Sequence, residues 1–412
     1  MKHARPTVLY VAAVRDAAGI NASPGAVLVQ GDRVVAAGEP DRLPAELVAQ
    51  AEVIERPNDL LLPAMVNAHT HLELTSIGPQ PYDPAGGFVG WIKMVQSLSP
   101  DLDVDWERPV YQGALQCVEA GVQAVGDIGP PDDVDSIKRA VGLDGVTYRQ
   151  LFGIGPPFDD PAKWIVNDTK KWGHDGLQPH APYSVGPGIY QLAQQSGRPV
   201  STHLAEHLEE AEFIADCKGP LLDYLKQIGK WDAAFAAHYG QGLSPVQWMR
   251  PHLETAAGQG GWLVAHCNYV SDEDIAILAD TNTSVAYCPI ASEYFGHANH
   301  RCLDMLAAGV NVCLGTDSIV GTVADDPQPL GLLGAMRRLY ERDQIDPDML
   351  LAMATTHGVR ALRLDSRLAT LQPGAPARFA CLPINPESNT DPLVQVLTRQ
   401  DQVEAISFDV PD

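Results

Sequence analysis

The middle of the chain alternates between segments with helical spacing of apolar residues and short apolar segments typical of β-strands. Residues 106–120 have helical spacing and stop at Gly121, and a strand-like segment, 122–127, follows at once. The unit recurs downstream, with helix and strand at 189–196 and 199–203, 272–279 and 284–289, and 302–308 and 310–315. This alternation predicts an α/β fold with a parallel sheet, and its extent of roughly 300 residues fits a (β/α)8 TIM barrel. An open doubly wound sheet is the alternative, but it usually carries a Gly-rich phosphate-binding turn after its first strand, and the chain has none there.

The two ends of the chain are rich in strand-like patterns instead. Residues 26–38 read as two short strands around a turn, and residues 377–384 and 403–408 have the same character. We therefore expect two domains, because strand patterns flank the alternating middle on both sides. The predicted division is a small β domain made of residues 1–58 and 370–412, and a barrel made of residues 59–369.

Composition narrows the possible partners and the cellular compartment. The chain has 412 residues with a formal net charge of −24, and such an acidic surface repels nucleic acid. No apolar run approaches the ~18 residues that a membrane span needs, and residues 7–14 read as a strand and not as a signal peptide. The seven cysteines are odd in number and lack Cys-x-x-Cys spacing, which is typical of reduced thiols. We expect a cytoplasmic protein that binds neither nucleic acid nor a membrane.

An apolar run that reads as one short buried strand, residues 60–72, contains His69 and His71 at its end. Side chains two positions apart in a strand point to the same face, so both imidazoles can present a nitrogen to one point. Two histidines in a surface loop are the alternative, because a His-x-His pair alone is a common pattern. A buried strand that ends in two polar rings needs a partner for them, however, and a divalent metal ion is a fitting one.

Several other strand-like segments also end in titratable side chains. A single histidine at a strand end is more often a satisfied structural group, but the strand ends of a barrel converge, which favours a shared centre. A catalytic zinc ion takes a few nitrogen and oxygen ligands and keeps one position open for water. The predicted ligands are His69, His71, His203 and Asp317. The other strand-end histidines are His180 and His266.

Two further residues are candidates for proton transfer beside the metal. Glu206 stands three residues after His203, and is either a first-turn acid favoured by the dipole of the following helix or a proton shuttle. His266 is either a satisfied core histidine or the group that polarises the attacking water or the tetrahedral oxygen. His238 is its main rival, but the segment before His238 lacks a strand pattern. Asp317 can act both as a ligand and as the first acceptor of the water proton.

Together these motifs resemble the amidohydrolase superfamily over nearly the whole chain. Besides the flanking β segments, the resemblance rests on 63–71 (PAMVNAHTH), 203–206 (HLAE), 264–267 (VAHC) and 314–318 (LGTDS). No lysine stands at a plausible fourth strand end, where binuclear members carry a carboxylated lysine. The match is therefore to the mononuclear branch that deaminates nucleobases and nucleosides. This resemblance implies one Zn²⁺ (or Fe²⁺) per subunit, a barrel joined to a small β-sandwich, and Glu206 as the proton shuttle.

Within that branch, the chain is similar to aminofutalosine deaminases and their neighbours that act on S-adenosylhomocysteine and methylthioadenosine. The segments that carry this likeness are 88–92 (FVGWI), 120–127 (AGVQAVGD), 179–184 (PHAPYS), 242–246 (GLSPV), 287–289 (YCP) and 295–297 (FGH). The resemblance implies hydrolytic deamination of an adenine-type nucleoside, with release of ammonia and with His180 against the ribose or the ring. Our further candidates for substrate contacts are Arg149, Trp91 and Ser318. The chain departs from the family at 318–330, which replaces an Asn-rich loop, and at 293–295, which lacks a polar pair; both lie where the substrate tail is expected.

Other functions remain open on the same scaffold. A triazine chlorohydrolase, a guanine deaminase or a pterin deaminase would share the barrel ends and differ in the pocket for the substrate tail. A metal-stabilised binding or scaffold protein is the non-enzymatic alternative, but it has no need of a carboxylate and a histidine beside the ligands. The expected partner is a small-molecule heteroaromatic amine, and the resemblance allows a homo-oligomer.

Overall fold

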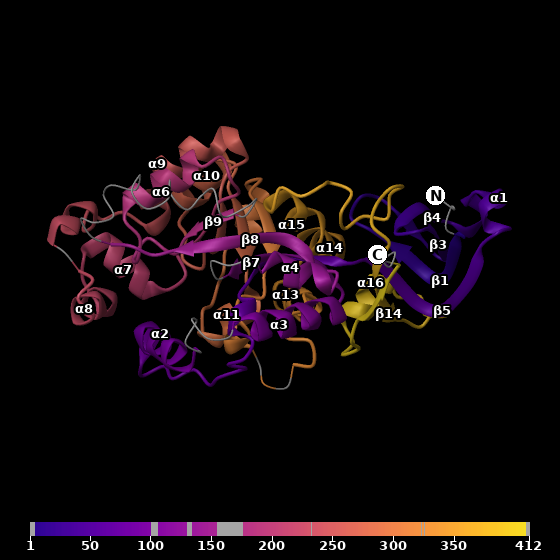
Figure 1. Ribbon diagram of the computed structural model, residues 1–412, viewed down its shortest axis with the longest axis horizontal. Coiled ribbons are helices and arrows are strands. Elements are labelled where there is room, and N and C mark those ends of the chain that lie inside the picture. The colour runs from indigo at the N-terminus through magenta and orange to yellow at the C-terminus, as the bar shows by residue number, and fades with distance from the viewer. Residues whose placement is uncertain are drawn as a thin grey trace.

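In the computed structural model, a barrel of strands and helices adjoins a small sheet at one end of the molecule, and both ends of the chain lie near that sheet (Figure 1). The structure describes residues 5–99, 106–129, 134–154, 176–231, 233–322, 324 and 326–408. The first and last four residues of the predicted small domain, and positions 323 and 325 of segment 318–330, lie outside the described residues.

Eight strands of the described chain form the barrel. They are β6 (Met65–Thr70), β7 (Val122–Gly129), β8 (Asp144–Leu151), β9 (Gly176–Pro179), β10 (Ser201–Leu204), β11 (Leu263–His266), β12 (Ser284–Tyr287) and β13 (Asn311–Leu314). They pair as two parallel sheets, β6-β7-β8-β9 and β10-β11-β12-β13. Parallel bridges between Leu177 and Val200, and between Thr70 and Asp317, join the sheets at both seams. The predicted (β/α)8 TIM barrel is therefore confirmed.

Helices surround the barrel and continue beyond its rim (Figure 1). They are α2 (Gly87–Leu98), α3 (Glu107–Glu119), α4 (Asp135–Ala140), α6 (Pro187–Gln195), α7 (Leu208–Asp216), α8 (Pro220–Gln227), α9 (Pro245–Ala256), α10 (Asp272–Asp280), α11 (Pro289–Tyr294), α12 (Cys302–Ala307), α13 (Leu333–Asp343), α14 (Pro347–Ala354), α15 (Thr356–Ala361) and α16 (Pro392–Leu397). Gly121 and Gly309, where two helical patterns stop, both adopt positive φ, of 73° and 85°. Glycine takes this conformation without a side-chain clash, so these residues end the helices as the pattern predicts.

The terminal segments form the predicted β-sandwich domain, in which the strands of both chain ends share one sheet. The strands are β1 (Thr7–Arg15), β2 (Asn21–Ala22), β3 (Gly25–Gln30), β4 (Arg33–Gly38), β5 (Glu52–Pro63), β14 (Arg378–Pro383) and β15 (Glu404–Ser407), and the short helix α1 (Ala45–Val48) follows β4. Their order is β15-β14-β5-β1-β3-β4, with β2 beside β1. Alternate residues of β1 face two different apolar clusters, with Leu9 in one and Val8 in the other. Both faces of the sheet are therefore covered.

The strand predicted over residues 60–72 is in fact two strands with different partners. Leu60–Leu62 are the end of β5 and pair with β14 in the small sheet, whereas β6 begins at Met65 and pairs with β7 in the barrel. The prediction of one strand was wrong because an unbroken apolar run does not show which sheet covers each part. The division lies at Ala64, so this segment leads directly from one sheet into the other.

None of the described helices combines the length and the apolar character needed to cross a lipid bilayer.

Candidate metal and catalytic centre

Polar side chains from four barrel strands meet at the carboxyl ends of those strands. His69 and His71 come from the end of β6, and His203 lies in β10. His266 is the last residue of β11, and Asp317 follows β13. All of them are buried, with at most 7% of any residue exposed. We call this group the His/Asp cluster: His69, His71, His203, His266 and Asp317.

The ligand atoms of the His/Asp cluster lie within a few ångströms of one another. The Nε2 atom of His71 is 3.3 Å from Nε2 of His203 and 3.5 Å from Oδ1 of Asp317. The same carboxylate oxygen is 3.6 Å from Nε2 of His69. Ligand atoms of His69, His71 and Asp317 lie within 4.8 Å of one another, and so do those of His69, His203 and His266. The structure thus brings together the four side chains that were predicted as metal ligands.

Several nitrogens of the cluster are buried without a hydrogen-bond partner among the described residues. Both ring nitrogens of His69 and Nε2 of His266 are in this state. Buried polar atoms are usually hydrogen-bonded, so orphaned nitrogens that converge on one point indicate a missing ligand. A set of imidazole nitrogens and one carboxylate oxygen is the donor set that Zn²⁺ and similar divalent ions prefer. The cluster is therefore fit to hold a metal ion.

The backbone at these strand ends adopts a conformation that few residues tolerate. Ala205, His266, Cys267 and Asp317 have positive φ, of 51°, 77°, 55° and 61°. Non-glycine residues rarely adopt such angles, and they persist where the surrounding structure holds them. One such support is visible, because Nε2 of His300 donates to the carbonyl oxygen of His266 at 2.9 Å. The tight turns direct side chains of β10, β11 and β13 into the barrel mouth.

The surroundings favour the protonation states that a metal site needs. Burial lowers the pKa of His69 and His203, and it lowers the pKa of His266 to about 3. Burial alone would raise the pKa of Asp317, but the close approach of His69, followed by His266 and His71, outweighs it and holds this pKa well below its usual range. Metal ligands are neutral imidazoles and ionised carboxylates, and the shifts at His69, His203 and Asp317 favour these states.

Glu206 lies at the edge of the cluster, before helix α7. Its Oε1 atom is 3.8 Å from Nε2 of His266, and the residue is 5% exposed. Burial, together with the charges of Asp317 and Glu210, raises the pKa of Glu206 well above its ordinary value. This environment favours the protonated form of Glu206 compared with an exposed glutamate, whereas the environment of Asp317 nearby favours its ionised form. Glu206 is not an acid in the first turn of α7, which was the alternative, because α7 begins at Leu208 and its N-cap residue is His207.

Two ligand rings are oriented from behind. The Nδ1 atom of His203 donates to the carbonyl oxygen of His180 at 2.9 Å. The Nδ1 atom of His71 is 3.3 Å from Oε1 of Glu73. Burial alone would lower the pKa of His71, but the hydrogen bond and charge of Glu73 raise it. In His71 and in His203, Nδ1 therefore points away from the cluster. The Nε2 atoms of the two rings face each other at 3.3 Å.

His180 and Ser318 adjoin the cluster. The ring of His180 is 5.0 Å from that of His203, and its Nδ1 atom is 2.6 Å from Oγ of Ser184. Burial lowers the pKa of His180 to about 3, so the ring is neutral. Ser318 follows Asp317, and its Oγ atom is buried without a partner among the described residues. Their substrate roles stay predictions, but both have polar groups beside the centre.

Arg149 and Trp91 lie further out. Arg149 is half-buried near the carboxyl end of β8, in register with Gly129 and Leu177. Trp91 lies on α2, where its ring stacks on Phe88 at 5.8 Å and meets Phe295 edge-on at 5.2 Å. Their substrate roles also stay predictions.

Three residues near the centre were not predicted from the sequence. Glu73 follows the His-x-His pair, and Glu210 accepts the backbone N–H groups of Ala205 and Glu206 at 3.2 and 2.8 Å. Lys138, from α4, is 2% exposed and reaches within 3.5 Å of Asp127 on β7. Glu73 and Glu210 could have been found from the sequence, because they stand two residues after His71 and four residues after Glu206. Lys138 gives no such signal, because it is distant in sequence from every motif.

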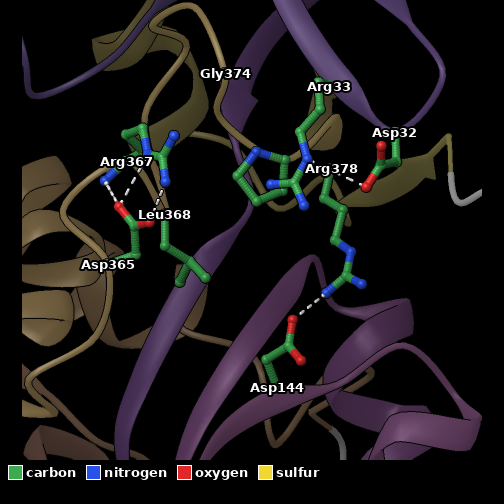
Figure 2. A pocket seen from close by; sticks show the side chains of 9 residues that line it. Asp32, Arg33, Asp144, Asp365, Arg367, Leu368, Gly374 and Arg378 are labelled. Atoms are coloured by element: carbon green, nitrogen blue, oxygen red, sulfur yellow. Dashed lines mark hydrogen bonds and ion pairs between the residues drawn. The ribbon is translucent and has the colours of Figure 1, made fainter.

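A second group of charged residues surrounds a cavity at the opposite end of the barrel (Figure 2). Asp144, which begins β8, places this cavity at the amino ends of the strands, and Arg378 at the start of β14 contributes from the small sheet. The lining residues are Asp32, Arg33, Asp144, Asp365, Arg367, Leu368, Gly374, Pro376 and Arg378. The cavity is therefore separate from the His/Asp cluster.

Comparison with known proteins gives a consistent result. Residues 60–406 match a family model described as the amidohydrolase family. A 5-methylthioadenosine/S-adenosylhomocysteine deaminase of Symbiobacterium thermophilum is 27% identical over 385 residues, which cover 86% of this chain and 79% of that protein. An aminodeoxyfutalosine deaminase of Deinococcus radiodurans is 29% identical over 369 residues, which cover 82% of each chain.

Solved structures match the fold over almost the full length. An aminofutalosine deaminase of Helicobacter pylori in complex with methylthio-coformycin aligns with a TM-score of 0.79 at 20% identity, over 98% of each chain. An adenosine deaminase from Xanthomonas campestris with bound zinc aligns with a TM-score of 0.73 at 18% identity, over 98% of this chain and 91% of that one. At this identity the likeness shows a shared fold.

Proposed function

The chain belongs to the amidohydrolase family, and from this premise we propose that it is a metal-dependent hydrolase that deaminates an adenine-type nucleoside. The observation that carries the proposal is the His/Asp cluster with Glu206 beside it, buried where the barrel strands end. The family model and the relatives point the same way, because the relatives that span most of the chain are named as deaminases of 5-methylthioadenosine, S-adenosylhomocysteine and aminodeoxyfutalosine. The substrate is a small molecule of this nucleoside class.

The proposed ligands of one Zn²⁺ (or Fe²⁺) per chain are His69, His71, His203 and Asp317. Their converging atoms and the orphaned nitrogens of the cluster support this assignment. The bound zinc of the Xanthomonas campestris adenosine deaminase favours zinc as the ion. Such an ion would supply Lewis acidity that lowers the pKa of water from its bulk value to about 7.

The protein groups then move protons in a defined order. Water adds through its oxygen to the ring carbon that bears the amino group, and Asp317 takes up the first proton of that water. Glu206 delivers a proton to the ring nitrogen next to that carbon, and His266 stabilises the oxygen that becomes the carbonyl. The amino nitrogen then gains the proton that Asp317 took up, the carbon–nitrogen bond breaks and ammonia leaves. The remaining hydroxyl proton returns to Glu206 as the carbonyl forms. The raised pKa of Glu206 and the lowered pKa of Asp317 suit these two roles, because one carboxyl must carry a proton while the other accepts one.

Recognition of the rest of the substrate is assigned to groups around the cluster. His180 is neutral and lies against the ring of His203, and its Nδ1 atom is hydrogen-bonded to Ser184, so it can contact the ribose or the base through Nε2. Ser318 offers a hydroxyl group without a partner among the described residues. Arg149 and Trp91 are proposed contacts at larger distance. The cytoplasmic location, the lack of a nucleic-acid partner and the homo-oligomer stay predictions from the sequence.

The experiment is an ammonia-release assay on a panel of heteroaromatic amines, with metal analysis of the same sample. The panel contains adenosine, 5′-deoxyadenosine, methylthioadenosine, S-adenosylhomocysteine, aminofutalosine, guanine, a pterin and an aminated triazine. We expect turnover of one or more of the adenine nucleosides and close to one metal ion per chain. Turnover confined to guanine, the pterin or the triazine would contradict the proposed substrate class.

The matched variant is Glu206→Gln. It should retain the metal and lose about 10²–10⁴-fold in kcat, since a positioned acid–base group contributes this much. Glu212→Gln on the same helix, α7, is the control and should behave as the parent protein. A Glu206→Gln protein within about tenfold of the parent rate would remove the shuttle role.

A further inference from the structure

A carboxylate is buried directly behind one of the proposed ligands. Glu73 lies in the 3-10 turn Leu72–Leu74, and its side chain is 12% exposed. Its Oε1 atom is 3.3 Å from Nδ1 of His71. Its Oε2 atom is buried and has no hydrogen-bond partner among the described residues. The ring of His71 is thus the side-chain partner that this carboxylate has in the described structure.

The fold itself gains little from a carboxylate at this position. Among the described ion pairs, Glu73 has no arginine or lysine partner, and the nearby charge of Asp127 repels it. Removing a carboxylate from water is unfavourable unless a cation or several hydrogen bonds replace the lost hydration. A buried acid that is poorly compensated and adjoins a metal-ligand candidate indicates a functional role.

The position of Glu73 determines which nitrogen of His71 faces the cluster. A neutral imidazole carries one N–H group, and a carboxylate beside Nδ1 holds that hydrogen there. The lone pair of Nε2 is then free, and this atom lies 3.5 Å from Oδ1 of Asp317 and 3.3 Å from Nε2 of His203. We propose, on the basis of the metal-dependent function above, that Glu73 is a positioning residue that orients His71 and raises the affinity of the site for its metal ion.

The three histidines proposed as ligands differ in the partner of their Nδ1 atom. The Nδ1 atom of His203 donates to a neutral acceptor, the carbonyl oxygen of His180, at 2.9 Å. The Nδ1 atom of His69 has no partner among the described residues. His71 has the charged acceptor, which makes its ring the strongest electron donor of the three. Glu73 therefore tunes the metal through one ligand in particular.

The test measures metal binding as well as activity. Glu73→Gln keeps the shape of the side chain but removes the charge, and its amide can present either oxygen or nitrogen to His71. Glu73→Leu removes both charge and hydrogen bond. Asp274→Asn is the control, because Asp274 is a carboxylate that is 1% exposed, accepts the backbone N–H of Ser271 at the start of α10 and does not belong to the cluster. The readouts are the Zn²⁺ dissociation constant from competition with a chromophoric chelator, the visible spectrum of the Co²⁺ form, and the melting temperature without metal.

We expect Glu73→Gln to bind Zn²⁺ about 10–100-fold more weakly, as found when partners behind metal-binding histidines are removed. Its Co²⁺ spectrum should shift, while Asp274→Asn keeps the affinity and spectrum of the parent protein. Parent affinity and an unchanged spectrum in both Glu73 variants would overturn the inference, as would a change confined to the melting temperature. If Glu73→Leu does not fold, Glu73→Gln decides alone. A parent protein that binds no metal would instead contradict the proposed function.

Discussion

Both ends of the barrel carry clusters of charged side chains, but the two clusters are in opposite states. At the amino end, each arginine around the cavity in Figure 2 has an aspartate partner. The nitrogen–oxygen distances are 3.2 Å for Arg33–Asp32, 2.5 Å for Arg367–Asp365 and 2.8 Å for Arg378–Asp144. These side chains are 20–57% exposed, so water also solvates them.

At the carboxyl end, the charged and polar groups are buried and incompletely paired. The His/Asp cluster exposes at most 7% of any residue, and three of its ring nitrogens have no partner among the described residues. Glu206 and Glu73 add carboxyl groups whose pKa burial raises. Pairing and exposure, more than the number of charges, therefore separate a structural cluster from a functional one. Groups that satisfy one another in water need no ligand, whereas buried groups that remain unpaired do.

The largest effect on turnover is expected at Asp317, in the buried cluster at the carboxyl end. Asp317→Asn removes the one carboxylate of the proposed ligand set and the acceptor of the water proton. Turnover should fall by roughly four orders of magnitude or more, and the metal content should fall with it. Steady-state kinetics and metal analysis check this, with Asp365→Asn at the amino end as control. A variant that keeps a full complement of metal and substantial turnover would show that the cluster does not work as a metal site.

The next largest effect is expected on stability, at the buried ion pair between Lys138 and Asp127. Lys138 is 2% exposed and lies 3.5 Å from Asp127 and 3.1 Å from Asp135. Lys138→Met should lower the free energy of unfolding by about 3–5 kcal/mol, because it leaves Asp127 buried without its cation. Urea denaturation measures the loss, and the double variant Lys138→Met/Asp127→Asn should regain part of it. A loss below about 1 kcal/mol would mean that water solvates Asp127.

A smaller effect is expected in the pH dependence of stability. Burial raises the pKa of Glu210 to about 8 from its ordinary 4.5. The stability from Glu210 is therefore fully present below pH 4.5 and is lost as pH rises through about 8. Melting curves between these limits should show the parent protein declining relative to Glu210→Gln, by at most about 1.4 kcal/mol per pH unit. Parallel curves for the parent protein and Glu210→Gln would contradict the raised pKa.

The smallest effect is expected at the amino-end cavity. Arg378→Gln breaks the pair with Asp144, whose side chain is 45% exposed. The expected loss of unfolding free energy is about 1 kcal/mol or less, because exposed ion pairs contribute little, and turnover should not change. Thermal denaturation and the ammonia assay check both. A large loss of turnover would show that this end of the barrel takes part in function, and the contrast between the two ends would then fail.

Much of the candidate site could be predicted because its signals are local. His69 and His71 share a strand face through their spacing alone, and His203, His266 and Asp317 each stand at or just after a short apolar strand. The convergence of strand ends in a barrel then supplies the contact between distant segments. The break at Ala64 was missed for the opposite reason, because residues 60–62 and 65–70 are equally apolar and differ only in the strands beside them.

The barrel, the β-rich ends and the converging residues could be predicted because hydrophobic period and strand-end position are properties of neighbouring positions along the chain. Which polar groups lack partners could be seen only once the chain was folded. Glu73 behind His71, Lys138 beneath Asp127 and the paired arginines at the other end all depend on which segments far apart in the chain come together. Burial and pairing arise from that packing, and they set the pKa values and leave ring nitrogens of the His/Asp cluster without partners among the described residues.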